Sequence, residues 1–142
     1  MAPIEEHRHD HDHDHAPALT KNQKLVFDAL SNSVQPMSAY SILDKLRDAG
    51  LRAPLQVYRA LDKLMESGKV HRLESLNAFV ACAHTHCHDD CASAFAICEK
   101  CGAVAEFSDD IVMDRLKGWS SKAKFTHSKM TVEIRGLCVA CG

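Results

Sequence analysis

Residues 53–75 read APLQVYRALDKLMESGKVHRLES, and this stretch predicts a helix followed by a short strand. Pro54 suits the first turn of a helix, and Gly68 suits the residue just past its end. The apolar residues between them recur at helical spacing: Val57, Ala60, Leu61, Leu64 and Met65. One side of this helix therefore faces a core, and the opposite side presents polar residues.

Working outward, the sequence predicts two helices before this stretch and a hairpin around its end. Thr20 can cap a helix over roughly residues 21–32, and Ser38 can cap a second helix that stops at Gly50. Residues 69–75 and 77–82 are short β-prone runs joined by a turn at Leu76 and Asn77. The expected core residues of the first two helices are Val26, Ala29, Leu30, Ala39, Ile42, Leu43 and Leu46. Three helices followed by a hairpin are the element order of a winged helix-turn-helix.

The polar side of the third helix carries candidate DNA-contacting residues, namely Gln56, Tyr58, Arg59 and Lys63. Arginine and glutamine hydrogen-bond to base edges in the major groove, whereas tyrosine and lysine commonly contact phosphate. The alternative is that these residues are simply the solvated face of a small helical domain. Residues 16–80 hold nine Lys/Arg against six Asp/Glu, which is compatible with either interpretation.

The composition of the 142-residue chain, 46% hydrophobic and 25% charged, is that of a soluble protein. The sequence lacks an apolar run of about 18 residues and a signal-peptide-like segment, so we expect a cytoplasmic protein that does not enter a membrane. Residues 1–17 include HRHDHDHDH and predict a disordered tail. That tail is either a solvated extension or a weak metal-capturing segment.

Residues 93–142 predict a second, smaller domain, joined to the first (residues 18–82) by a connection over residues 83–92. ASAFAIC and AVAEFS are short β-like runs, and Asp109 and Asp110 start an amphipathic helix. The expected core residues of that helix are Ile111, Met113, Leu116 and Trp119. Residues 125–138 alternate well enough for a final strand. The expected class is therefore α+β, and so small a second domain usually needs a staple.

Two Cys-x-x-Cys pairs can supply that staple. They are Cys98 with Cys101 and Cys138 with Cys141, each followed by glycine. Two such pairs are the arrangement of a tetrahedral four-cysteine zinc site. The competing interpretation is a thioredoxin-like dithiol, but a single pair would suffice for that chemistry and no long βαβ pattern surrounds these cysteines.

A second group of candidate metal ligands lies on the hairpin, the connection and the second domain. Its members are His71, Cys82, His84, His86, Cys87, His88, Cys91, Glu106 and His127. So many ligands at a domain junction favour a second metal site, and metal binding there could set the angle between the domains. The sequence contains no H-E-x-x-H signature and no nucleophile–base arrangement, so we do not expect an enzyme.

Residues 19–142 resemble the ferric uptake regulator family. The resemblance rests on APLQVYRALDKLMESGKVHRLES, NAFVAC and the two CxxC pairs on either side of the last helix and strand. Within the family, VYRALDKLMESGKVHRLES, FAICEKCGAVAE and GLCVAC resemble the zinc uptake regulators. The resemblance implies a homodimer with winged-helix domains and C-terminal dimerisation domains. It also implies about two zinc ions per chain and zinc-dependent repression of zinc-uptake genes at an AT-rich inverted-repeat operator.

The resemblance also implies roles for individual residues. Cys98, Cys101, Cys138 and Cys141 match the structural zinc ligands, and Tyr58 and Arg59 match the DNA-reading positions. The regulatory zinc set is matched by His71, Cys82, Glu106 and Cys91, with His88 or His86 as alternatives to Cys91. The zinc regulators have histidine at the position of Cys91, so this ligand is a departure from their pattern. His84, His86 and His127 are candidates for a third site.

Thiolate ligands such as Cys82 favour zinc over Fe(II) or Mn(II). The rival functions are an iron-, manganese- or peroxide-sensing regulator of the same family. Outside that class, the rivals are a thiol redox protein and a zinc carrier.

Overall fold

The computed structural model describes residues 17–83 and 93–142. Residues 1–16 of the expected tail over residues 1–17 and residues 84–92 of the expected connection over residues 83–92 lie outside the described residues. The domain boundaries that depend on that connection therefore stay predictions. Within the described residues, no helix combines the length and apolar character needed to cross a membrane.

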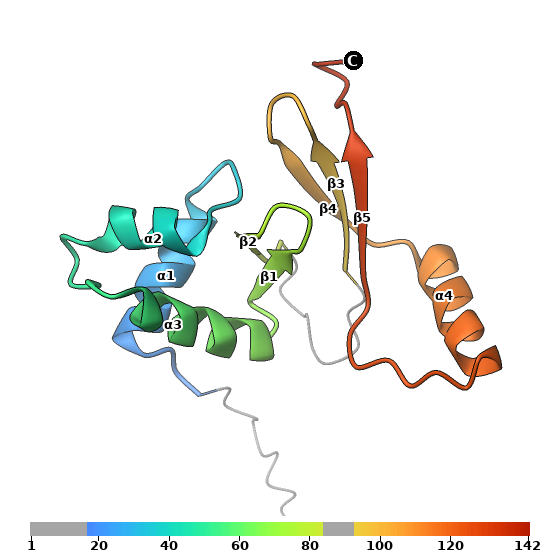
Figure 1. Ribbon diagram of the computed structural model, residues 1–142, viewed down its shortest axis with the longest axis horizontal. Coiled ribbons are helices and arrows are strands. Elements are labelled where there is room, and N and C mark those ends of the chain that lie inside the picture. Colours follow the sequence, from blue (N-terminus) through green and yellow to red (C-terminus); the bar gives the residue numbers. More distant parts are fainter. Residues whose placement is uncertain (1–16, 84–92) are drawn as a thin grey trace, which may run out of the picture.

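The N-terminal half has the predicted order of three helices and a hairpin (Figure 1). Its elements are α1 (Lys21–Ser31), α2 (Ala39–Leu46), α3 (Pro54–Glu66), β1 (Val70–Leu73) and β2 (Ala78–Ala81). The predicted caps are confirmed: the Thr20 hydroxyl accepts from the Gln23 amide, and the Ser38 hydroxyl accepts from the Ser41 amide. Such caps satisfy amides that would otherwise lack partners in the first turn, so the sequence sets where α1 and α2 begin.

The three helices bury their predicted faces against one another. Every residue expected on the inner faces of α1 and α2 is buried, and so are four of the five stripe residues of α3. The fifth, Met65, is partly buried against the same core. Val70 and Phe79 extend this core into the hairpin, which fixes the hairpin to the helices.

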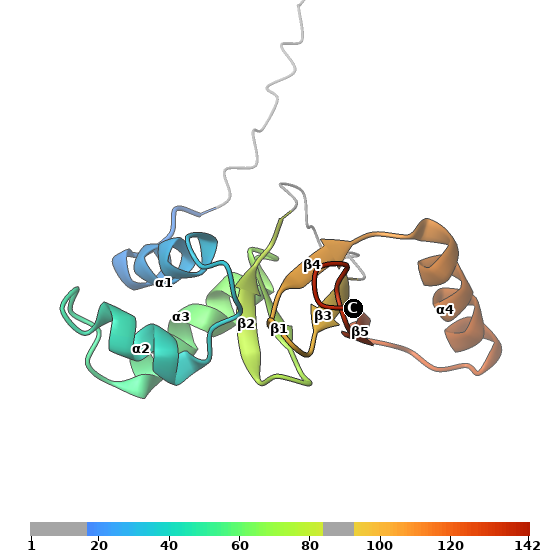
Figure 2. The ribbon, with the colours of Figure 1, turned by 90° about the horizontal axis from the view of Figure 1, so that it is seen from above.

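The hairpin β1–β2, here called the wing, lies between the helices and the second half of the molecule in both views (Figures 1 and 2). Its strands are antiparallel, with His71 opposite Val80 and Leu73 opposite Ala78. Asn77 has φ +47°, a left-handed conformation that asparagine tolerates better than most residues, so the predicted turn is confirmed.

The C-terminal half consists of β3 (Ser93–Cys98), β4 (Val104–Phe107), α4 (Asp110–Lys122) and β5 (Thr131–Gly136). The strand order is β4-β3-β5, in which β3 pairs antiparallel with β4 and parallel with β5. The connection through α4 carries the chain from one edge of the sheet to the other (Figure 1). It thereby brings the second CxxC pair beside the first. The predicted α+β class is confirmed.

Two details of the C-terminal half differ from the sequence prediction. Of the four residues expected to form the core side of α4, only Met113 is buried, whereas Ile111, Leu116 and Trp119 are 73%, 37% and 63% exposed. The reason is that α4 stands apart from the sheet (Figures 1 and 2), so one chain offers it little to pack against. The last strand begins at Thr131, six residues later than the alternation predicted.

The small core of the C-terminal half is shared with the wing. It consists of Leu73 from β1 with Phe95 and Ile97 from β3, and Val80 and Val104 pack against it. Phe95 and Leu73 are fully buried. Because these side chains come from both halves, apolar packing as well as polar contacts holds the wing against the sheet.

Candidate metal centres

The four-cysteine cluster is formed by the two turns that the sequence singled out. The Sγ atoms of Cys98, Cys101, Cys138 and Cys141 all lie within 4.8 Å of one another. Cys98 ends β3, and the chain turns back toward β4 at Gly102, whose φ of +74° is in the left-handed region that glycine tolerates. The second turn follows β5 and is closed by the Cys141 amide, which donates to the Cys138 carbonyl at 2.9 Å.

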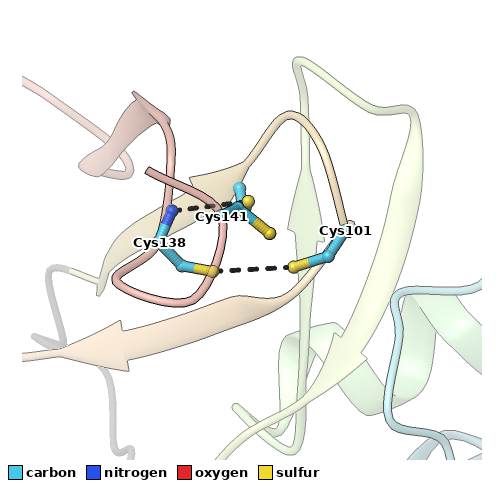
Figure 3. Close-up of side chains that lie close together, drawn as sticks. Cys101, Cys138 and Cys141 are labelled. Atoms are coloured by element: carbon cyan, nitrogen blue, oxygen red, sulfur yellow. Dashed lines mark hydrogen bonds between the residues drawn. The ribbon is translucent and has the colours of Figure 1, made fainter.

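Hydrogen bonds within this cluster support thiolate chemistry (Figure 3). The Cys138 amide donates to Cys98 Sγ at 3.4 Å, and the Sγ atoms of Cys101 and Cys138 are 3.8 Å apart. Backbone amides of Cys101, Cys138 and Lys100 lower the pKa of Cys98 to about 6. Hydrogen bonding to Cys138, followed by burial, raises the pKa of Cys141 to about 12.

These opposite shifts mean that the four thiols cannot all ionise easily without a cation between them, because the first thiolates oppose the later ones. Zn²⁺ supplies that charge and takes four cysteine ligands in a tetrahedral arrangement. The donor set therefore fits zinc.

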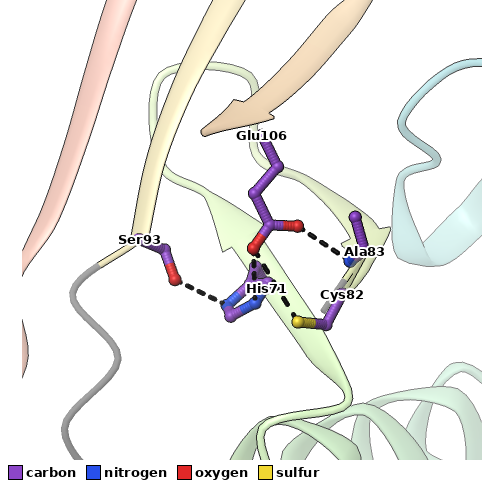
Figure 4. A network of polar contacts seen from close by, with 5 residues as sticks. All are labelled: His71, Cys82, Ala83, Ser93 and Glu106. Atoms are coloured by element: carbon purple, nitrogen blue, oxygen red, sulfur yellow. Dashed lines mark hydrogen bonds and ion pairs between the residues drawn. The ribbon is translucent and has the colours of Figure 1, made fainter. Parts of the chain in front are cut away.

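A second cluster contains His71, Cys82 and Glu106, whose ligand atoms also lie within 4.8 Å of one another. His71 Nε2 is 3.5 Å from Glu106 Oε1, and Cys82 Sγ donates to the same oxygen at 3.7 Å (Figure 4). The side chains of His71 and Glu106 are only 10% and 8% exposed. A nitrogen, a sulfur and an oxygen donor thus meet in a buried position, which suits zinc.

Three elements of the fold bring this cluster together. His71 lies on β1, and Cys82 follows β2 with its amide donating to the Lys69 carbonyl at 2.8 Å. Glu106 lies on β4, and its Oε2 accepts from the Ala83 amide at 2.9 Å. The wing therefore supplies two donors and the C-terminal sheet supplies the third, so the cluster exists only when the two halves are together.

Neighbouring residues orient the imidazole of His71. Its Nδ1 lies 3.4 Å from Ser93 Oγ, and its ring packs against Phe95 with centroids 5.5 Å apart (Figure 4). With Nδ1 directed to Ser93, Nε2 faces Glu106. A polar partner on the distal nitrogen is the usual way in which proteins orient a metal-binding histidine.

A solvent-open cleft of about 330 Å³ reaches this cluster and gives an ion a route to it. Its lining includes Cys82 and Glu106 from the cluster, and Gln35 and Pro36 from the segment between α1 and α2. Gln35 also bridges the halves directly, because its Nε2 donates to the Cys101 carbonyl at 2.9 Å.

Neither cluster of described residues includes the remaining predicted ligands. Cys91, His88 and His86, the candidates for a fourth ligand, lie outside the described residues, as do Cys87 and His84. His127 is exposed and belongs to neither cluster. The fourth regulatory ligand and the third site therefore stay predictions.

Two of the predicted DNA-contacting residues project from α3 into solvent. Tyr58 is 40% exposed and Arg59 is also exposed, on the side away from the buried stripe. Gln56 instead caps its own helix, because its Oε1 accepts from the amides of Arg52 and Ala53 at 2.8 and 3.1 Å. Lys63 Nζ donates to Glu66 at 2.9 Å, and hydrogen bonding to Glu66 raises the pKa of Lys63.

Sequence reasoning missed three residues that bear on the second cluster: Ser93, Gln35 and Glu133. Ser93 lies beside His71, whereas Gln35 and Glu133 join the two halves. No local pattern marks these residues, since each partner is 22 or more positions away along the chain. The capping role of Gln56 was recoverable, because glutamine three residues after a helix start is a known capping signal.

Comparison with known proteins places these sites in a family. The sequence model of the ferric uptake regulator family matches residues 14–135. The zinc uptake regulation protein of Escherichia coli (strain K12) is 40% identical over 124 residues, which is 87% of this chain and 72% of that protein.

Solved structures agree with that match. A zinc uptake regulator complexed with zinc and DNA has a TM-score of 0.80 and 38% identity, with 87% of this chain and 82% of that chain covered. The structure of holo XcZur has a TM-score of 0.77 and 39% identity, with 86% of this chain and 84% of that chain covered. The chain belongs to the ferric uptake regulator family.

Proposed function

We propose that this protein is a zinc-responsive transcriptional repressor that binds operator DNA as a zinc-loaded homodimer and represses zinc-uptake genes. The observation that carries the proposal is the cluster of His71, Cys82 and Glu106, because it draws its donors from both halves of the molecule. The similarity of the chain to a zinc uptake regulation protein and to a zinc uptake regulator in complex with zinc and DNA supports the proposal. In this role the protein is a regulator, not an enzyme.

The two clusters have different tasks in this proposal. Cys98, Cys101, Cys138 and Cys141 staple the C-terminal half, whose own core is small. His71, Cys82 and Glu106 sense zinc, with Cys91, His88 or His86 as the fourth ligand, giving about two zinc ions per chain. The proposal includes a candidate third site, formed by His84, His86 and His127.

Zinc would act by supplying a positive charge where two acidic groups converge. Cys82 Sγ and Glu106 Oε1 are 3.7 Å apart, so their ionised forms repel each other. A bound cation reverses this repulsion and links the wing to β4. Zinc binding therefore favours the arrangement in which wing and sheet are together. The size of this effect is the difference between the affinities of zinc for the joined and the separated arrangements.

In the proposal, DNA recognition and dimerisation use exposed surfaces that contain no zinc ligand. Arg59 and Tyr58 on α3 are the proposed contacts with base edges and phosphate or thymine methyl groups, and Lys63 and the amide NH₂ of Gln56 are secondary candidates. Ile111, Trp119, Phe125 and Ile134 are each more than half exposed, and these apolar side chains would be covered in a homodimer. A two-fold dimer matches an AT-rich inverted-repeat operator.

Zinc-buffered gel shifts on AT-rich inverted-repeat DNA test the proposal. We expect specific binding that a chelator abolishes and that zinc restores, together with about two zinc ions per chain after purification under reducing conditions. One zinc with one iron per chain would instead support an iron-sensing regulator. Specific binding that ignores zinc would leave a zinc carrier or thiol redox protein as the better description.

A pair of histidine variants sharpens this test. His71→Ala should abolish the zinc response and leave zinc on the four cysteines, because those ligands come from the other end of the sheet. His127→Ala should leave the response intact if only the first two sites regulate DNA binding. A weakened response in His127→Ala would instead support the third site.

A further inference from the structure

A carboxylate from the C-terminal sheet accepts two hydrogen bonds from the turn of the wing. Glu133 lies on β5, and its Oε1 accepts from the Glu74 amide at 2.6 Å while its Oε2 accepts from the Ser75 amide at 3.1 Å. These two amides belong to the turn between β1 and β2, some 58 residues earlier in the chain. Both oxygens of one side chain are thus used to join the two halves.

The turn leaves these amides available for Glu133. Its own hydrogen bonds use the amide of Leu76, which donates to Leu73, and that of Asn77, which donates to Glu74. Two successive amides therefore point outward to one acceptor. Hydrogen bonds that an ionised group accepts are stronger than neutral ones.

The charge state of Glu133 suits this role. Burial by itself raises the pKa of Glu133, but hydrogen bonds from Ser75 and Glu74 and the positive charge of Arg135 lower it overall. An ionised carboxylate only accepts hydrogen bonds, which is what two amide donors require. The contact is therefore formed at neutral pH.

The register of the sheet relates this contact to the His71–Cys82–Glu106 cluster. Phe95 in the central strand β3 lies opposite Glu106 on β4 and opposite Glu133 on β5. Paired residues share a face of the sheet, so Glu106, Phe95 and Glu133 form one row across it. His71 contacts Glu106, and Leu73 packs against Phe95 in the small apolar core. The turn after Leu73 donates hydrogen bonds to Glu133.

Strand β1 is therefore held along this row at three places. The His71–Cys82–Glu106 cluster holds its first half, the apolar packing of Leu73 holds its last residue, and Glu133 holds the turn that follows it. A rigid strand attached at both ends cannot rotate over the sheet without breaking one attachment. The Glu133 contact needs no metal, so it favours the same arrangement whether or not zinc is bound.

We propose that Glu133 is a positioning residue of the zinc response, which holds the wing at the orientation where His71 and Cys82 meet Glu106. This inference rests on the proposed function as a zinc-responsive repressor. In this role a residue of β5 that is not a metal ligand keeps the three ligands of the sensor close together in the absence of zinc. Because coupling between two contacts is reciprocal, loss of Glu133 weakens zinc binding at the sensor and zinc binding strengthens the Glu133 contact.

The test uses the full-length protein with Glu133→Gln and Glu133→Ala, and Glu74→Gln as a matched control. Glu74→Gln also removes one carboxylate at the turn, but the Glu74 side chain is 66% exposed and the backbone amide that donates to Glu133 is retained. The measurement is the free zinc concentration at half-maximal specific DNA binding, in zinc buffers. Hydrogen exchange at the amides of Glu74 and Ser75 reports the contact itself.

We expect both Glu133 variants to need roughly tenfold more free zinc than the wild type. Exchange at the two amides should accelerate, whereas the zinc held by the four cysteines should not change. Glu74→Gln should match the wild type in zinc requirement.

A zinc midpoint within about twofold of the wild type in both variants overturns the inference. So does a lower melting temperature with an unchanged zinc midpoint, because a merely structural role would give that result. If the wild type itself shows no zinc-dependent DNA binding, the proposed function fails instead, and the hydrogen-exchange measurement still decides whether Glu133 holds the turn.

Discussion

Replacing Glu106 by glutamine should lower the stability of the protein only in the presence of sensor zinc. Glutamine keeps the size of the side chain and an oxygen that can accept from the Ala83 amide, as Glu106 does at 2.9 Å. It removes the negative charge that faces Cys82 Sγ at 3.7 Å and His71 Nε2 at 3.5 Å. Without zinc, the variant should be about as stable as the wild type, because glutamine has nearly the same size and keeps the hydrogen bond from the Ala83 amide.

With zinc, the variant should lose most of its stabilisation. Removing a residue that merely supports a metal ligand lowers metal affinity by about 10- to 100-fold, so loss of a charged ligand should lower it by at least about 100-fold. At free zinc of about 1,000 times the wild-type Kd, zinc stabilises the wild type by about 4.1 kcal/mol. The variant would then be at about ten times its own Kd and would gain about 1.4 kcal/mol. The difference of about 2.7 kcal/mol corresponds to roughly 8 °C in Tm for a chain of this size.

The assay is thermal unfolding at buffered free zinc, with the four-cysteine site loaded throughout. Glu66→Gln is the control, because the Glu66 carboxylate is 65% exposed on α3, pairs with Lys63 and belongs to neither cluster. The control should show the full wild-type shift with zinc. A Glu106→Gln protein whose zinc-induced shift stays within about 1 °C of the wild type would refute the assignment of Glu106 as a ligand.

Four further predictions concern the rest of the molecule. Cys141→Ser should release the structural zinc and unfold the C-terminal half at lower temperature, which metal analysis and circular dichroism would detect; retention of that zinc would contradict the four-cysteine assignment. Arg59→Ala should weaken specific DNA binding by about 1–3 kcal/mol and relax one base position, as measured by binding to a library of operator variants, whereas equal loss on all sequences would make Arg59 a phosphate contact. Trp119→Glu should shift the protein from dimer to monomer in sedimentation velocity, because Trp119 is 63% exposed on α4; an unchanged dimer would place the interface elsewhere. Glu133 has a lowered pKa, so its contribution to stability is complete above the ordinary glutamate pKa and is lost as the pH falls through the lowered value. Between about pH 6 and about pH 3, the wild type should therefore lose more stability in denaturant melts than Glu133→Gln, and parallel losses would contradict this assignment.

The elements of the N-terminal half could be predicted closely because their signals are local. Thr20 and Ser38 satisfy amides only a few residues away, and the apolar stripe of α3 follows from helical geometry alone. The two CxxC pairs are equally local, since each turn brings its own two cysteines together. The association of His71, Cys82 and Glu106 came from family resemblance, because no spacing rule joins a hairpin to a strand 24 residues further on.

By itself, the sequence determined the helices, their caps, the wing and the two Cys-x-x-Cys turns, because each depends on interactions within a few residues. Only the tertiary structure decided how β1 lies along the row of Glu106, Phe95 and Glu133, and which side of α4 stays exposed. Both depend on which surfaces meet after the chain has turned back on itself. The physical reason is that burial and hydrogen bonding between distant residues are set by the packing of whole elements, and no short stretch of sequence encodes that packing.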